Sequence, residues 1–286
     1  MRLQDVGALV GSAAMWGASF IFMRVLAPVM GWAWAADLRV LIGGILVAAI
    51  MFWTREPLNL KRDWKHFLVL GLINSAIPFA LFAIAALHVP AAYSAIGNAT
   101  APLWSALLGF LLFRDQLSGR KLIGLCLGVF GVVLTARAGT VALTTPMLLA
   151  FGGTLLAACL YAFAGAYMKT KAKHISAMAL GCGGQLAAVV WLLPLLAFQQ
   201  PNWALVDLRI VLLMLGAGVI STGLPYVLYF PLMRRIGVTN AMTVTFLVPC
   251  FAFAFGYFFL DENLSLGAIL GCALVISGLM LALRNR

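Results

Sequence analysis

The sequence predicts an all-α integral membrane protein with ten transmembrane helices, arranged as two inverted five-helix repeats. Three observations lead to this prediction: the composition, a succession of long apolar runs, and an internal repeat. Of the 286 residues, 64% are hydrophobic and only 9% are charged, and the mean hydropathy is +1.06. A soluble protein would carry charge on about a quarter of its residues, so the chain is expected to reside in a lipid bilayer.

Ten apolar runs are each long enough to cross a bilayer as a helix, which takes about 20 residues. The runs are continuous rather than alternating, which favours helices over a β-barrel. The loops between them are short, so no soluble domain is expected. The predicted helices span residues 6–27, 33–53, 64–87, 90–112, 119–137, 146–168, 176–198, 208–232, 237–260 and 265–284.

Lysine and arginine are distributed unequally between the two sides of these helices. With the N-terminus inside, fifteen fall on the cytoplasmic side, and only Arg24, Arg39, Arg137 and Arg209 fall on the other. Cytoplasmic loops carry an excess of positive residues. Both termini of this multi-pass protein are therefore expected in the cytoplasm, with the chain in a bacterial-type inner (plasma) membrane and without a removable signal peptide.

Residues 68–137 recur as residues 215–284, without a gap and at a constant offset of 147. The loop `FRDQLSGRKLIG` (113–124) returns as `LDENLSLGAILG` (260–271), in which the positive residues have been lost. The repeat therefore divides one membrane domain into two five-helix halves.

The predicted halves are residues 1–138 and 139–286. Because five is odd, the second half must enter the membrane inverted relative to the first. The positive copy of the repeated loop then lies inside and the other copy outside. Inverted repeats are typical of transporters that alternate access around a midplane site.

Charged residues are expected to avoid the helix centres. Arg24, Asp37, Arg39 and His88 are predicted near the outer ends. Without a central Lys/Arg pair, the chain has no obvious means to bind a phosphate, and without a central carboxylate it has no obvious proton-coupling site. The predicted cargo is a neutral or zwitterionic solute that moves mainly down its own gradient.

Uncharged polar and aromatic residues occupy the helix centres instead. They would suit a small organic solute bound in an apolar cavity with few hydrogen-bonding groups. The alternative is that they join helices, since Ser, Thr and Asn commonly hydrogen-bond between membrane helices. The predicted cavity residues are Trp16, Ser19, Asn74, Asn98, Thr100, Trp104, Tyr161, Thr222, Tyr226 and Thr245.

Four prolines, Pro78, Pro102, Pro225 and Pro249, fall within predicted helices and are matched between the repeats. Proline removes the hydrogen bond to the carbonyl four residues back and favours a kink. We expect these kinks to act as hinges for gating. The alternative is a structural role, since proline is commoner in membrane helices than in soluble ones.

Three segments carry a resemblance to a known family: `MWGASFIFMR` (15–24), `FRDQLSGRKLIGLCLGVFGVVL` (113–134) and `LDENLSLGAILGCALVISGLML` (260–281). With them the chain resembles the drug/metabolite transporter (DMT) superfamily, specifically its ten-helix EamA-type transporters. The resemblance implies an inner-membrane protein with a central cavity and frequent export of amino acids or other metabolites. Within the family, the chain is most similar to the (aromatic) amino-acid exporter group. The family usually carries a Trp-Ala pair in its sixth helix, and `LYAFA` (160–164) departs from that pair.

The predicted function is export of small neutral or zwitterionic metabolites, amino acids first, by alternating access without obligatory ion coupling. One alternative is efflux of hydrophobic drugs or other metabolites. Another is a polytopic lipid-modifying enzyme, which would need reactive groups at a membrane surface, whereas this chain offers basic loops and short turns. No catalytic set, cofactor motif or metal-ligand spacing is present, so no enzyme activity, cofactor or metal site is predicted.

The expected partners are a small-molecule substrate and membrane lipids. The net charge of +11 is explained by membrane orientation rather than by binding of nucleic acid. The chain is compatible with a monomer or a homodimer.

The predicted topology can be tested by placing single cysteines in the two copies of the repeated loop. An impermeant thiol reagent should label a cysteine at Asn263 in intact cells, but not one at Ser118, because only the former is expected outside. The reverse labelling pattern would contradict both the topology and the inversion of the repeats.

Overall fold

The computed structural model describes residues 2–113, 118–137, 142–236, 241, 244–263 and 265–283. Every regular element in these ranges is a helix. Eight helical spans are long and apolar enough to cross a membrane, and two shorter apolar helices follow them. The all-α fold with ten membrane helices is thereby confirmed.

Several spans consist of more than one helix. In chain order the elements are α1 (Leu3–Met30), α2 (Trp32–Thr54), α3 (Leu60–Leu70) continued by η1 (Gly71–Ala76) and α4 (Ile77–His88), α5 (Ala91–Ala99) and α6 (Ala101–Phe113), α7 (Gly119–Arg137), α8 (Thr145–Thr170), α9 (Ala177–Leu196), the short η2 (Trp203–Leu205), α10 (Leu208–Gly218) continued by η3 (Val219–Gly223) and α11 (Leu224–Ile236), α13 (Val244–Leu260) and α14 (Leu266–Leu283).

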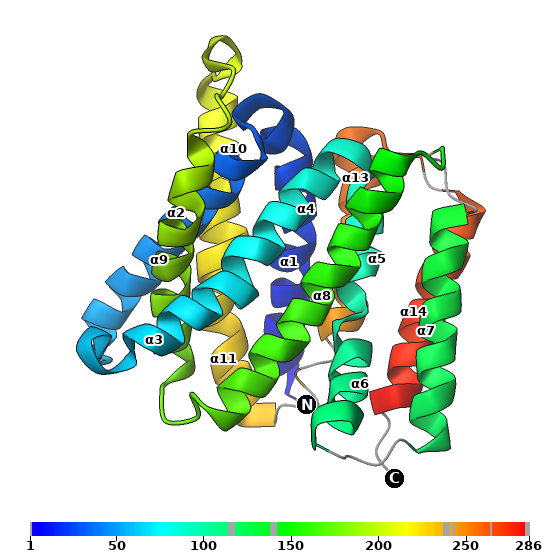
Figure 1. Cartoon of the computed structure of the whole chain (residues 1–286), viewed down its shortest axis with the longest axis horizontal. Helices are drawn as coiled ribbons and strands as arrows, with labels where there is room; N and C mark the ends of the chain where they lie inside the picture. Colours follow the sequence, from blue (N-terminus) through cyan, green and yellow to red (C-terminus); the bar gives the residue numbers. More distant parts are fainter. Residues whose placement is uncertain are drawn as a thin grey trace.

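These bounds agree closely with the predicted helices. The start of the predicted ninth helix, over residues 237–240 and 242–243, lies outside the described residues, as do Arg114 and Asp115 of the repeated loop. The first described turn of α1 and the last of α14 lie on the same side of the molecule (Figure 1). That arrangement follows from an even number of crossings.

Helices α7 and α14 lie side by side at one edge of the bundle (Figure 1) and pack through glycines. A Cβ atom on Gly131 would lie 2.6 Å from the carbonyl oxygen of Gly271, and one on Gly278 would lie 2.5 Å from the carbonyl oxygen of Gly124. Such close backbone approach is typical of glycine-mediated packing between membrane helices.

The glycine contact is reciprocal. Gly271 and Gly278 are the repeat counterparts of Gly124 and Gly131, and the earlier glycine of each helix meets the later glycine of the other. The two helices therefore run antiparallel. A two-fold axis between the repeats would produce this self-complementary pattern, in which each contact has its symmetry mate.

Two spans change their helical geometry immediately before a matched proline. The π-helical segment η1 precedes Pro78, and η3 precedes Pro225. The N–H groups of Ile77 and Leu224 each bond to a carbonyl five residues back rather than four. Proline cannot donate to the carbonyl four residues back, and single π turns inside helices are frequent at functional sites.

The other two matched prolines differ from each other. Pro102 follows a break at Thr100, which separates α5 from α6 instead of merely kinking one helix. Its missing N–H leaves the carbonyl of Asn98 without its helical donor, and the Thr100 hydroxyl donates to the carbonyl of Gly97 at 2.6 Å. Pro249, in contrast, lies inside the continuous helix α13.

The glycine contact predicts that Gly131→Ala lowers the free energy of unfolding by about 1–3 kcal/mol. The added methyl group would meet a backbone oxygen, which cannot move aside as a flexible side chain can. Thermal unfolding of the purified protein in detergent measures the effect.

Gly152→Ala is the matched control, because a Cβ atom at Gly152 in α8 meets nothing within 4 Å. This substitution should cost nothing, and better helix propensity can add up to about 1 kcal/mol. Equal melting temperatures for the two variants would contradict the close packing of α7 against α14.

Candidate functional site

Arg39 on α2 is the centre of a polar group inside the bundle. Its side chain is only 4% exposed, and Nε donates a hydrogen bond to Oγ1 of Thr222 at 2.8 Å. The guanidinium group lies over the ring of Phe79, 4.0 Å from the ring centroid. A charged side chain is thus held between α2, α4 and η3.

The position of Arg39 near one end of α2 agrees with the sequence-based prediction, whereas the burial of its side chain inside the bundle was not expected. Thr222 lies about 14 residues beyond Leu208, the start of α10, or about 21 Å by helical rise. Arg39 lies early in α2, where a long side chain can extend to the interface. Its bond to Thr222 and its stacking on Phe79 direct it inward instead.

Two of the predicted cavity tyrosines face the same charge. Tyr161 on α8 and Tyr226 on α11 are both close enough to Arg39 to interact with it electrostatically. Both rings lie deep among the helices, yet each keeps part of its surface accessible. The structure therefore brings Tyr161, Thr222 and Tyr226 together around Arg39.

Gln185 on α9 belongs to this group but was not predicted. Its side chain is 1% exposed and hydrogen-bonds to Tyr226. Its Oε1 atom has no hydrogen-bond partner among the described residues. The signal that could have identified it is an amide inside the apolar run `GCGGQL`, because polar groups inside membrane helices are costly and usually have a partner or a function.

Small residues allow these helices to approach one another. A Cβ atom on Gly43 of α2 would lie 2.6 Å from Cγ2 of Thr222 and 3.1 Å from Oε1 of Gln185. A larger residue at position 43 would push η3 and α9 away from α2. The bond between Arg39 and Thr222 therefore depends on a glycine four residues after the arginine.

Aromatic side chains continue from the polar group into an apolar cluster. Phe82 stacks on Tyr161 with ring centroids 6.3 Å apart and meets Phe20 edge-on at 5.4 Å. Trp16 meets Tyr229 edge-on at 5.0 Å. Trp16, Tyr161 and Tyr229 are only partly buried against this cluster, so aromatic surface remains accessible beside the charge.

The remaining predicted residues differ in how far they are buried. Ser19 and Thr100 are buried, which favours a packing role. Asn98 and Trp104, on either side of the break at Thr100, are partly exposed and make no side-chain hydrogen bond or ring contact within the described chain. Asn74 and Thr245 are also partly exposed and are placed in η1 and α13.

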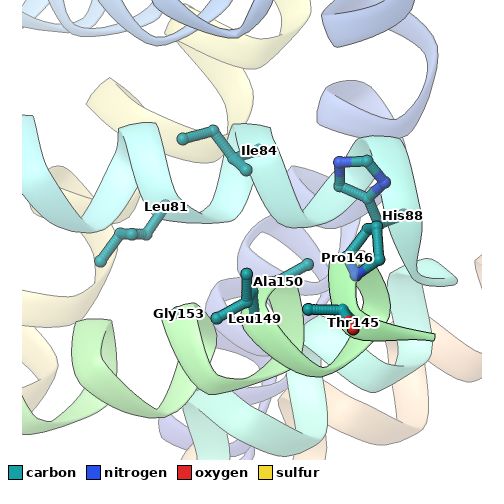
Figure 2. Close-up of a pocket in the computed structure, with 8 residues that line it drawn as sticks. All are labelled: Leu81, Ile84, His88, Thr145, Pro146, Leu149, Ala150 and Gly153. Carbon is teal, nitrogen blue, oxygen red and sulfur yellow. The ribbon is translucent and has the colours of Figure 1, made fainter. Parts of the chain in front are cut away.

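Two surface grooves lie apart from this site. One, of about 510 Å³, runs between α4 and α8, and Figure 2 shows His88 and Thr145 at one end and Leu81 at the other. The second, of about 480 Å³, lies between α13 and α14. None of the predicted cavity residues lines either groove. Their apolar walls suit lipid chains rather than a polar solute.

A buried carboxylate joins the loop after α13 to two helices of the first repeat. Glu262 accepts hydrogen bonds from the N–H of Ala91, at the start of α5, at 3.0 and 3.1 Å. Its Oε1 lies 3.5 Å from Nε of Arg24 on α1. Burial raises the pKa of Glu262, because the loss of hydration outweighs the effects of Ala91 and Arg24.

Ten apolar helices, matched π turns and a polar group enclosed between both halves of the chain define a multi-pass membrane transporter. The sequence profile of the EamA-like transporter family matches residues 6–137 and, a second time, residues 147–284. The chain therefore belongs to the EamA-like transporter family, within the drug/metabolite transporter superfamily. The two matches fall on the two halves that the repeat predicts.

Several curated proteins are similar over nearly their whole length. The uncharacterized transporter YoaV of Bacillus subtilis is 22% identical, over 96% of this chain and 94% of its own. A probable amino-acid metabolite efflux pump of Escherichia coli is 26% identical, over 93% and 90%. A probable terminal-alkyne amino-acid exporter of Streptantibioticus cattleyicolor is 24% identical, over 98% and 93%.

One solved crystal structure shares the fold. It superposes with a TM-score of 0.64 at 17% identity and covers 99% of this chain and 97% of its own. At this identity the likeness concerns the fold alone.

The raised pKa of Glu262 leads to a prediction about its charge. At pH 7.5, Glu262→Gln should unfold at the same temperature as the wild type or slightly higher, because it keeps an acceptor for Ala91 and removes a buried charge. Glu262→Ala should lose about 1 kcal/mol, as helix N-caps do.

The pH dependence has a definite sign. Since the pKa is raised in the folded protein, folding favours the protonated carboxyl, and its stabilising effect is lost as the pH rises through the raised pKa. Any advantage of Glu262→Gln should therefore shrink on acidification. If Glu262→Gln were as unstable as Glu262→Ala, the ion pair with Arg24 would be the dominant interaction.

Proposed function

We propose that this protein exports small zwitterionic metabolites, foremost amino acids, across a bacterial-type inner membrane by alternating access. The observation that carries the proposal is the interior group in which Arg39 donates a hydrogen bond to Thr222, with Tyr161 and Tyr226 within electrostatic reach and accessible aromatic surface beside it. One charge, a few hydroxyl groups and an apolar wall suit a solute with a small polar end and an apolar body. The names of two relatives, an efflux pump for amino-acid metabolites and an amino-acid exporter, support the same class of substrate.

The location of the group supports alternating access. Arg39 belongs to the first half of the chain, and Tyr161, Thr222 and Tyr226 belong to the second. A solute bound there would touch both halves, and rocking of one half against the other would expose it to each side in turn. The π turns before Pro78 and Pro225 and the break before Pro102 are the positions at which we expect the helices to bend.

Asp37 is the buried acid to be considered as a site for a coupling ion, because it lies near Arg39 in the sequence. Asp37 on α2 is 3% exposed, and its Oδ1 has no hydrogen-bond partner among the described residues. It lies two residues before Arg39, and residues at this spacing on a helix do not face each other. We propose that Asp37 does not bind an obligatory coupling ion, and that transport equilibrates the solute along its own gradient.

These proposals predict uncoupled flux of a neutral amino acid in proteoliposomes that contain the purified protein. A panel of the twenty radiolabelled amino acids, without an imposed pH or sodium gradient, should identify at least one that equilibrates faster than in protein-free vesicles. Hydrophobic drugs, tested in the same vesicles, should move more slowly.

Asp37→Asn is the matched control for coupling. It should transport at the wild-type rate both with and without a gradient. Flux that required a proton gradient in the wild type and lost this requirement in Asp37→Asn would contradict the proposal and identify Asp37 as the coupling group. Transport of drugs alone would contradict the proposed substrate class.

A further inference from the structure

Arg39 carries a buried positive charge that no carboxylate among the described residues neutralises. Its bond to Thr222 uses one of the five N–H donors of a guanidinium group. Within the described chain, the two terminal nitrogens make no hydrogen bond and no ion pair. Among the described residues, the fully enclosed side-chain atoms that lack a hydrogen-bond partner belong to Asp37, Ser94 and Gln185. The two terminal nitrogens of Arg39 are not among them, so they keep some accessible surface. Four donors therefore remain available to something outside the chain.

An unpaired charge inside a membrane protein is costly, so such residues normally pair with another group or serve a function. Asp37 is the nearest acid in the sequence, but it lies on a different side of α2 and forms no ion pair with Arg39. Glu262 is held by Ala91 and Arg24. The partner that compensates Arg39 is therefore best supplied by the solute.

The guanidinium geometry selects the kind of solute group. Two parallel N–H donors fit a carboxylate bidentately. A doubly charged phosphate would require further cations, yet Arg39 is the one Lys or Arg that is buried in the described part of the chain. The hydroxyl groups of Tyr161 and Tyr226 lie within electrostatic reach, and Gln185 restrains Tyr226 through its hydrogen bond. A single carboxylate, with one negative charge, balances the one positive charge of Arg39.

We propose that Arg39 binds the carboxylate of the transported solute, with the hydroxyl groups of Tyr161 and Tyr226 beside it. This inference rests on the proposed function and specifies which end of an amino acid enters the polar group. The apolar end then lies along the ring of Phe82, which stacks on Tyr161. Carboxamides and amines of the same shape bind poorly, because they leave the charge of Arg39 uncompensated.

The test uses simple probes that carry or lack a carboxylate. Phenylacetate and the isosteric phenylacetamide are titrated at constant ionic strength against the purified full-length protein, and the melting temperature is followed. A ligand that binds only the folded state raises the melting temperature in proportion to its affinity. Phenylacetate should stabilise the wild type, and phenylacetamide should not.

Three variants separate binding at Arg39 from structural effects. Arg39→Gln should lower the apparent affinity for phenylacetate by about tenfold or more, the effect of losing charge-assisted hydrogen bonds. Without ligand it should melt no lower than the wild type, because an uncompensated charge is removed. Arg39→Lys keeps the charge but loses the paired donors, so it should bind phenylacetate more weakly than the wild type. Arg209→Gln removes an exposed charge and should bind as the wild type does.

The outcomes are distinct. Equal stabilisation of the wild type and Arg39→Gln by phenylacetate overturns the proposal, as does the absence of stabilisation by phenylacetate at millimolar concentrations. If Arg39→Gln does not fold, undiminished binding by Arg39→Lys overturns it as well. If phenylacetate binds through Arg39 while no amino acid is transported in proteoliposomes, the carboxylate site stands and the proposed amino-acid substrate fails.

Discussion

Backbone hydrogen bonding in the absence of water is the constraint on which the rest of the structure depends. In the hydrocarbon region each unpaired N–H or C=O costs several kcal/mol, so the chain crosses as helices. Departures from regular helix are therefore informative. The π turns before Pro78 and Pro225 and the break at Thr100 all lie inside spans, where irregular backbone is tolerated only if protein or a water-filled cavity covers it. One of these departures, η3, contributes Thr222 to the interior group built on Arg39.

The helices and their repeat could be predicted because their signals are local and additive. Each run is apolar over about 20 residues, and the gapless offset pairs glycines and prolines without any knowledge of packing. The close contact of Gly131 with Gly271 follows from the same pattern, since small residues mark helix interfaces in membranes. Composition and spacing were sufficient for this level of structure.

The interior group could be predicted only in part. Tyr161, Thr222 and Tyr226 were identified because they are polar or aromatic and central. The inward direction of the Arg39 side chain could not be predicted, because sequence alone does not decide whether a long side chain extends to the interface or turns inward. That choice is made by Phe79 and Thr222, which come from other helices. Gln185 could not be predicted for the same reason, because its partner Tyr226 is 41 residues away in the sequence.

The second half of the chain carries no charge that corresponds to Arg39 in the first half. The hydrogen bond from Arg39 to Thr222 connects one half of the chain to the other. In the proposed alternating-access cycle, movement of one half against the other would strain that bond. The two end states would then be chemically unequal, although the two halves are related in sequence. A carrier of this kind holds its solute with different affinities on its two faces, while the ratio of inward to outward flux is still fixed by the gradient alone. Kinetic asymmetry would then arise from a single side chain rather than from the fold.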